Sequence, residues 1–155
     1  MVKHDLGDLE IFGENLYAIH SIEYRKLEHH FCVFAIREHS QWLSWEETQF
    51  YAAMLDLPTV PVKTEIMPKE RALFEAEMLM LVNEPGAFEP YDVYDHKATT
   101  MEGIVSRNAD SYHVNDFAQN VFKYVRKEHV KTDEHWIRNW KRAPLIHERR
   151  NDVDL

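Results

Sequence analysis

Two charged residues, Glu102 and Lys123, stand within short apolar segments, where a fold can hold a charged side chain in a fixed position. Glu102 begins the segment Glu-Gly-Ile-Val-Ser-Arg. Alternate residues of a β-strand share a face, so we expect Glu102 to point with Ile104 and Ser106. One carboxylate aimed into a cleft suits a divalent metal, which prefers hard oxygen ligands. A lone glutamate in such a strand is more commonly a solvated surface residue.

Lys123 is followed closely by two further basic residues, Arg126 and Lys127. A fixed ammonium group lowers the barrier of a transfer reaction that builds up charge on a phosphate. On a strand, Lys123 shares a face with Val125 and Lys127, whereas Arg126 lies on the opposite face unless the strand bulges. Arginine has a fork of donors that suits a phosphate group. The segment therefore suits an anionic ligand.

The histidines and the cysteine do not predict a zinc site. His29 and His30 are adjacent in sequence, and adjacent residues of a strand point to opposite faces. Cys32 is the only cysteine, and the sequence has no His-Glu-x-x-His pattern. Because Cys32 lies in an apolar run, we expect it to be a small buried residue.

The apolar pattern predicts the strands that position these residues. The unbroken run from Phe31 to Ile36 has the length and aromatic content of a strand buried on both faces. Two shorter extended pieces, 9–12 and 16–20, are expected on either side of a break at Gly13-Glu14-Asn15. Further strands are expected at 101–107 and 120–127.

Two main helices are predicted between the strands. The first covers 44–56, where Ser44 and Glu47 match a capping box. The second should begin at Pro68, a residue favoured in the first turn. Leu73, Ala76 and Met80 form one apolar stripe of this helix. Towards its end the stripe is widened by Met78, Leu79, Leu81 and Val82. A short helix is also expected at 133–140. Strands and helices that mix without regular alternation favour an α+β fold, with a mainly antiparallel sheet and flanking helices.

Length and composition are typical of one globular domain. We expect it to cover 1–147, followed by a charged flexible tail at 148–155. The sequence has no apolar run of about eighteen residues that could span a membrane, and its charged N-terminus is unlike a signal peptide. A cytoplasmic location is therefore the default expectation.

The net charge of −9 argues against a general electrostatic attraction to nucleic acid. The charge is uneven, however, because basic residues gather between Lys123 and Arg142. A local basic surface can therefore coexist with an acidic whole.

Three segments in order resemble motifs III, IV and V of the covalent nucleotidyltransferases, and most closely those of the ATP-dependent RNA ligase family. They are Phe12–Tyr24, Glu102–Arg107 and Val121–Trp136. The run 31–36 resembles the strand called motif IIIa, and 43–62 resembles the helix and strand that follow it. The resemblance covers most of the chain and weakens over 83–97 and beyond Trp136.

The resemblance implies the rear portion of a nucleotidyltransferase (ATP-grasp-like) domain that uses ATP, a divalent metal (Mg or Mn) and RNA ends. It implies catalytic roles for Glu102, through metal or phosphate geometry, and for Lys123, through the α-phosphate. Glu14 matches a residue at the nucleotide site, and its neighbour Gly13 permits a close backbone approach to a ligand. Phe34 matches the aromatic that packs against the purine, although it fits an ordinary core position equally well.

The basic residues after Lys123 depart from the family pattern. Better-known members carry a second lysine two residues later, where this sequence has Val125. The second basic role in binding the nucleotide therefore falls to Arg126 or Lys127, or is absent.

The family's nucleophilic lysine lies in a motif of the form Lys-x-Asp-Gly, which this sequence does not contain. In the family this lysine attacks ATP, the AMP passes to an RNA 5′-phosphate, and a 3′-hydroxyl displaces it. The segment Lys3–Gly7 has an inserted leucine and too few residues before Glu14. We therefore expect a missing segment, a second chain or a second copy to supply the lysine. An open sheet edge is expected where leading strands belong.

Two alternatives follow from the missing motif. One is a non-catalytic relative that binds nucleotide or RNA, and the other is a truncated remnant of the family.

Overall fold

The computed structural model describes residues 6–126 and 141–151, and the chain divides into two compact units. The first unit contains Met1–Asn15, Phe31–Pro61 and Val105–Phe122. The second contains Leu16–His30, Val62–Ile104 and Lys123–Leu155. Each unit joins stretches that are far apart in sequence, so long-range contacts hold each one together.

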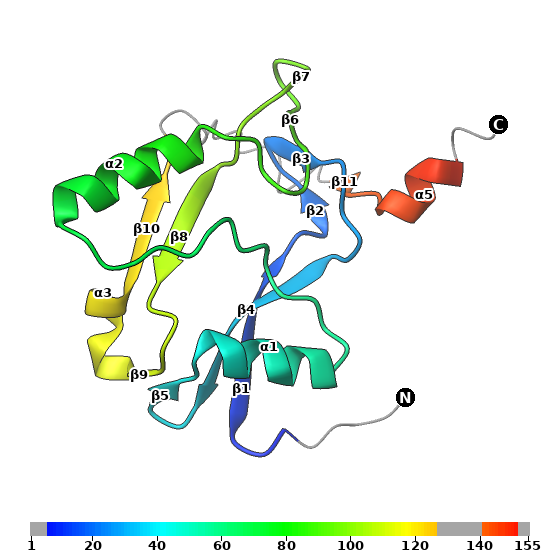
Figure 1. Ribbon diagram of the computed structural model, residues 1–155. Helices are drawn as coiled ribbons and strands as arrows, with labels where there is room; N and C mark the ends of the chain where they lie inside the picture. Colours follow the sequence, from blue (N-terminus) through cyan, green and yellow to red (C-terminus); the bar gives the residue numbers. More distant parts are fainter. Residues whose placement is uncertain (1–5, 127–140, 152–155) are drawn as a thin grey trace. The chain divides into compact units, whose positions relative to one another are not determined.

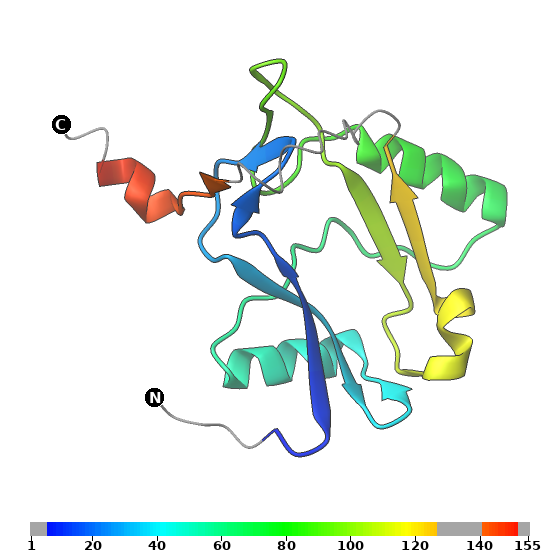
Figure 2. The ribbon, with the colours of Figure 1, turned by 180° about the vertical axis from the view of Figure 1, so that it is seen from behind.

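An antiparallel sheet in the order β1-β4-β5-β9 forms the centre of the first unit. Helix α1 (Trp45–Met54) packs on one face of this sheet (Figure 1), and Figure 2 shows the sheet from the opposite side. The buried core between them consists of Val33, Ile36, Leu43 and Ala52. The strands are β1 (Leu9–Asn15), β4 (Phe31–Glu38), β5 (Gln41–Trp42) and β9 (Tyr112–His113), and β9 is followed by η1 (Val114–Asp116) and α3 (Phe117–Asn120).

Strand β4 contains a β-bulge at Phe34. Phe12 pairs with Ala35 and Gly13 pairs with Val33, so Phe34 is an extra residue without a partner in the β1 register. A bulge inserts one residue into one strand of a pair and changes the direction of nearby side chains. In this case it interrupts the alternation that a regular strand would show.

The bulge explains how the apolar run at 31–36 packs. Val33 and Ile36 are three residues apart and would point to opposite faces of a regular strand, yet both lie in the core under α1. Phe31 and Phe34 are 37% and 41% exposed, while the other four residues of the run are buried. The predicted strand is therefore confirmed, but these two phenylalanines are exceptions to its predicted burial.

Strand β1 continues through Asn15, so the predicted break at Gly13-Glu14-Asn15 is wrong. Glu14 pairs with Cys32 and Asn15 with Phe31, which extends the ladder past the bulge. Local sequence favours a turn at a glycine, but pairing with β4 provides these backbone groups with hydrogen-bond partners in an extended conformation.

Helix α1 begins as its sequence predicts. The Ser44 side chain accepts a hydrogen bond from the Glu47 N–H at 3.1 Å, and the Glu47 carboxylate accepts one from the Ser44 N–H at 3.3 Å. This capping box satisfies donors that an uncapped helix would leave unpaired. Thr48 and Ala52 are the buried residues of the helix, and the helix ends at Met54, close to the predicted boundary.

The second unit contains two small antiparallel sheets and helix α2 (Arg71–Val82). One sheet has the order β3-β6-β7, and the other pairs β2 with β11. These strands are β2 (Ala18–Ile19), β3 (Ile22–Tyr24), β6 (Pro90–Asp92), β7 (Lys97–Ala98) and β11 (Lys141–Arg142).

Helix α2 buries only part of the predicted apolar stripe. Met78 and Val82 are buried, whereas Leu73 and Met80 are 60% and 73% exposed. Leu73, Ala76 and Met80 therefore lie on the outside of the helix, and the buried residues come from those that widen the stripe. Apolar residues occur on several sides of this helix, so periodicity alone did not determine which side is buried. The helix also starts at Arg71, three residues after Pro68.

Strands β8 (Gly103–Arg107) and β10 (Val121–Val125) form a two-stranded sheet and lie side by side in both views (Figures 1 and 2). The Arg126 N–H donates to the Glu102 carbonyl at 2.9 Å, and the Asn108 N–H donates to the Asn120 carbonyl at 2.8 Å. These two hydrogen bonds define an antiparallel pair. Each strand contributes residues to both units.

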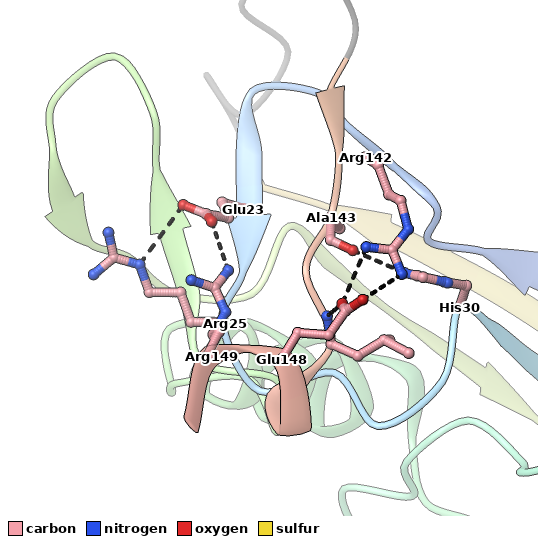
Figure 3. A network of polar contacts seen from close by, with 8 residues as sticks. Glu23, Arg25, His30, Arg142, Ala143, Glu148 and Arg149 are labelled. Atoms are coloured by element: carbon pink, nitrogen blue, oxygen red, sulfur yellow. Dashed lines mark hydrogen bonds and ion pairs between the residues drawn. The ribbon is translucent and has the colours of Figure 1, made fainter. Parts of the chain in front are cut away.

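Ion pairs attach the C-terminal helix α5 (Ile146–Asn151) to the rest of the second unit (Figure 3). Arg142 donates to both oxygens of Glu148, at 3.0 and 2.8 Å, and Glu148 also accepts the Leu145 N–H at 2.6 Å. Arg149 donates to Glu23 at 2.6 Å. Residues 148–151 belong to this helix. The flexibility of the tail from residue 148 stays a prediction.

The α+β class with mainly antiparallel strand pairing is confirmed. Within the described residues, no helix is both long and apolar enough to cross a membrane. A single domain over 1–147 stays a prediction. The predicted helix at 133–140 lies outside the described residues.

Candidate functional site

Glu102 lies immediately before β8 and is held at both its backbone and its side chain. Its carbonyl accepts the Arg126 N–H at 2.9 Å. Its carboxylate oxygen Oε1 accepts a hydrogen bond from the Tyr24 hydroxyl at 2.6 Å. Glu102 is half-buried. The simpler interpretation of this glutamate, as a fully solvated surface residue, therefore does not fit.

The close approach of β10 explains why a glycine, Gly103, follows this glutamate. A Cβ atom at Gly103 would lie 2.5 Å from the Tyr124 carbonyl oxygen and 3.2 Å from the Val125 Cα. Both are backbone atoms of β10, which cannot move aside as the end of a flexible side chain can. The glycine therefore allows β8 and β10 to approach closely beside Glu102.

Lys123 and Arg126 lie on and just after β10. Lys123 is exposed. Arg126 is half-buried, and its Nε is buried without a hydrogen-bond partner among the described residues. A buried donor left unpaired costs about 1–3 kcal/mol, so it commonly indicates an absent ligand or other partner. The structure thus brings the backbones of Arg126 and Glu102 together, while Lys123 lies within β10, three positions before the arginine.

Glu14 lies near the end of β1 in the first unit. It is exposed and pairs across the sheet with Cys32. Cys32 is buried, as its sequence context predicts. Burial raises the pKa of the Cys32 thiol, and the negative charge of Glu14 raises it further. Cys32 is therefore a protonated, inert core residue at neutral pH.

Gly13 has a structural role that the sequence does not reveal. A Cβ at this position would lie 2.3 Å from the Phe31 ring and 2.7 Å from the Cys32 carbonyl oxygen. The space left by the missing side chain is thus filled by β4. Close packing between the two strands therefore requires a glycine here, and the approach of a ligand at Gly13 stays a prediction.

Phe34 is the bulged residue of β4 and is 41% exposed. Of its two sequence interpretations, ordinary core packing therefore does not fit. Bulges are common next to binding sites, where they turn a side chain towards a ligand. An exposed phenylalanine ring has a flat apolar face that can pack against a nucleobase.

A cluster of aromatic rings around Arg37 lies in the first unit and was not predicted. The Phe12 and Trp42 ring centroids are 5.0 Å apart, and Trp42 and Phe117 are 6.1 Å apart. The Arg37 guanidinium lies 5.4 Å from the centroids of both Phe12 and Trp42. The sequence carries no local signal for this cluster, because strand register and the chain path bring the rings together.

Tyr24 is the other residue that sequence reasoning missed. It ends the segment Phe12–Tyr24, but its spacing gave it no chemistry. Its contact with Glu102 joins positions 78 residues apart. Lys127, the remaining predicted residue, lies outside the described residues.

The described residues contain no group of three or more His, Cys, Asp or Glu side chains that could hold a metal ion by themselves. Glu102 could supply one carboxylate ligand to a divalent cation. That arrangement is typical of Mg²⁺, which is commonly held by one or two carboxylates together with substrate phosphates.

Comparison with known proteins gives one result. The RNA ligase family matches residues 1–125. No curated protein and no solved structure matches the sequence. The matched range includes Glu14, Phe34, Glu102 and Lys123, whereas Arg126 follows its last residue.

Proposed function

Because the chain belongs to the RNA ligase family, we propose that it binds ATP with a divalent metal and contributes to adenylyl transfer for RNA end joining. In this proposal the chain forms part of a nucleotidyltransferase domain. Glu102 and Lys123 serve the chemistry, and Arg126 binds phosphate. The nucleophilic lysine comes from a segment or chain outside the present sequence.

The observation that carries the proposal is the pairing of Glu102 with Arg126 at the start of β8 and the end of β10. Lys123 lies on β10, three positions before Arg126. A hydrogen bond joins the backbones of Glu102 and Arg126, so a residue with a carboxylate and a residue with a guanidinium lie opposite each other. The unpaired, buried Nε of Arg126 suits an acceptor from outside the described residues. A phosphate oxygen is such an acceptor, and the guanidinium fork matches phosphate geometry.

These residues fit ATP and a divalent metal chemically. Glu102 offers oxygen ligands, and a metal bound there would neutralise charge on the nucleotide phosphates. Lys123 would add a positive charge near the α-phosphate, where charge develops during transfer. In this arrangement Arg126 orients the phosphates rather than reacting with them.

We assign Glu14 and Phe34 to recognition of the nucleoside. The Phe34 ring is exposed by its bulge and can pack against a purine. Glu14 is an exposed carboxylate two residues beyond Phe12 on the same strand face, and its oxygens can accept hydrogen bonds from ribose hydroxyls. Each assignment rests on the residue's own position in the first unit.

ATP binding tests the phosphate group of residues directly. We expect calorimetry with ATP and Mn²⁺ to show binding that Lys123→Ala and Arg126→Ala each weaken about tenfold or more, since bonds to charged groups contribute about 1.5–3 kcal/mol. Lys97→Ala is the matched control, because Lys97 is an exposed strand lysine in the same unit. Equal losses in all three variants would contradict a specific phosphate site.

Covalent labelling tests the origin of the nucleophile. The chain is incubated with labelled ATP and Mn²⁺, with or without a family segment that carries Lys-x-Asp-Gly, and then separated by denaturing electrophoresis. We expect label on the added segment and none on this chain alone. Label on the chain alone would show that its own residues include the nucleophile.

The absence of a Lys-x-Asp-Gly motif from the sequence also favours a second candidate, a non-catalytic relative that binds nucleotide or RNA. This candidate predicts ATP binding that depends on Lys123, with no covalent label in any mixture. The two experiments together therefore separate the candidates.

A further inference from the structure

We propose that Tyr24 is a positioning residue for Glu102, whose carboxylate it holds in the orientation required for binding a divalent metal with the nucleotide. The inference rests on the proposed function of Glu102. It adds a residue from β3, a strand distant in sequence from both β8 and β10.

The contact is short and directional. The Tyr24 hydroxyl donates to Glu102 Oε1 at 2.6 Å, within the range of a strong O–H···O⁻ hydrogen bond. Tyrosine supplies one neutral donor. It can therefore fix a carboxylate oxygen without cancelling the negative charge that attracts a cation, as an arginine or lysine partner would.

The surrounding structure holds both partners of this hydrogen bond. Tyr24 lies at the end of β3, where it pairs with Pro90 of β6. Its ring makes an edge-to-face contact with Phe88, with centroids 6.0 Å apart. Glu102 is fixed on its backbone by the Arg126 N–H. The hydroxyl and the carboxylate are therefore positioned by separate elements of the second unit.

This arrangement is the one expected of a residue that supports a metal ligand. Carboxylates that bind metals are themselves usually hydrogen-bonded, and loss of such a partner typically costs about 10–100-fold in metal affinity or activity. A purely structural tyrosine would affect folding and leave the metal dependence unchanged. The metal affinity is therefore the property that distinguishes the two roles.

The test is a double-mutant cycle for Mn²⁺ binding at saturating ATP. Binding is measured from the electron paramagnetic resonance signal of free Mn²⁺. The proteins compared are the wild type, Tyr24→Phe, Glu102→Gln and the double variant. Tyr24→Phe removes one oxygen and keeps the ring against Phe88. Tyr91→Phe is the matched control, since Tyr91 lies in the adjacent strand β6 and its ring contacts Arg25 at 3.4 Å.

We expect Tyr24→Phe to weaken Mn²⁺ binding about tenfold, with no further effect in the Glu102→Gln background. ATP affinity without metal should change little, the melting temperature of Tyr24→Phe should fall by only a few degrees, and Tyr91→Phe should match the wild type. The inference is overturned if Glu102→Gln weakens Mn²⁺ binding and Tyr24→Phe does not. It is also overturned if Tyr24→Phe weakens Mn²⁺ binding as much in the Glu102→Gln background as it does in the wild type.

A different result would identify failure of the proposed function itself. If Glu102→Gln leaves Mn²⁺ binding unchanged, Glu102 has no metal role and the inference falls with it. The same four proteins unfolded in urea without ligand then show whether the hydrogen bond exists. If the hydrogen bond exists, the effect of the double variant on the unfolding equilibrium constant should differ from the product of the two single effects by about three- to tenfold.

Discussion

At the scale of single residues, the backbone around Phe34 shows how one extra residue changes the role of a side chain. Val33 next to it is fully buried, whereas Phe34 is 41% exposed. Both are apolar and belong to one unbroken apolar run. The difference between them comes from the bulge, which removes Phe34 from the regular pairing of β4 with β1.

Substitution of these neighbours should separate binding from stability. We expect Phe34→Ala to weaken ATP binding roughly tenfold, because a base stacked on an aromatic ring contributes about 1–3 kcal/mol. Val33→Ala should instead destabilise the fold by about 2 kcal/mol and leave the affinity of the folded protein nearly unchanged. Calorimetry with ATP and urea unfolding measure the two effects. A larger loss of stability for Phe34→Ala than for Val33→Ala would show that Phe34 acts as core.

At the scale of elements, the close approach of β8 and β10 fixes the position of Glu102. The approach depends on Gly103, because an added Cβ would meet the backbone of β10 at 2.5 Å. Gly86 provides a contrast in the same unit, since a Cβ there would lie 3.5 Å from its nearest neighbour, an ordinary contact distance.

Two alanine substitutions test this role of Gly103. We expect Gly103→Ala to destabilise the protein by about 2 kcal/mol, as is usual for an added group in a filled space, and to weaken Mn²⁺ binding by displacing Glu102. Gly86→Ala should change the free energy of unfolding by about 0.5 kcal/mol or less. Urea unfolding and Mn²⁺ titration measure both properties. Tolerance of Gly103→Ala in both measurements would contradict the close approach.

The attachment of helix α5 through Glu148 should depend on pH. Hydrogen bonds from Arg142 and the Leu145 N–H lower the pKa of Glu148 from 4.5 to about 2. A carboxyl whose pKa is lower in the folded state stabilises the fold above its unfolded pKa. This contribution should therefore be complete above about pH 4.5 and disappear as the pH falls to about 2.

Comparison with Glu148→Gln isolates this contribution from the other carboxylates. We expect the difference in urea midpoint between wild type and Glu148→Gln to be constant above about pH 4.5 and to shrink as the pH falls towards 2. Titrations at a series of pH values follow the difference. A difference that stays constant down to pH 2 would show that Glu148 does not titrate in this range.

At the scale of the whole molecule, the net charge of −9 opposes general attraction to RNA. Binding of RNA by contact with phosphates alone needs many cations and weakens steeply with salt. In the proposed function the chain recognises nucleotide phosphates locally, through Lys123 and Arg126. Local recognition and overall repulsion are compatible, because charges further apart than about 8 Å are largely screened at physiological salt.

RNA and ATP binding should therefore respond differently to the charge of the chain. We expect a single-stranded homopolymer RNA to show no measurable binding to this chain at about 150 mM salt, while ATP binding with Mn²⁺ persists under the same conditions. Fluorescence anisotropy with labelled RNA and with labelled ATP measures both. Tight homopolymer binding with a steep salt dependence would contradict this expectation and indicate an extended basic surface.

The features that the sequence predicts well are those set by neighbouring residues. The capping box of Ser44 and Glu47 depends on residues three apart and forms as expected. The strand at 31–36 follows from the residue types themselves. The family is likewise predictable, because its motifs are short segments in a fixed order, and the match over residues 1–125 confirms it.

Other features depend on tertiary structure. Helix α2 has apolar residues on more than one side, so only packing decided that Met78 and Val82 are buried. The bulge at Phe34 arises from the register with β1, and the Tyr24–Glu102 hydrogen bond joins residues 78 positions apart. The sequence by itself determined the types of element and the chemical groups available. The tertiary structure decided which groups meet, because contacts between distant segments depend on register and packing, which no local pattern encodes.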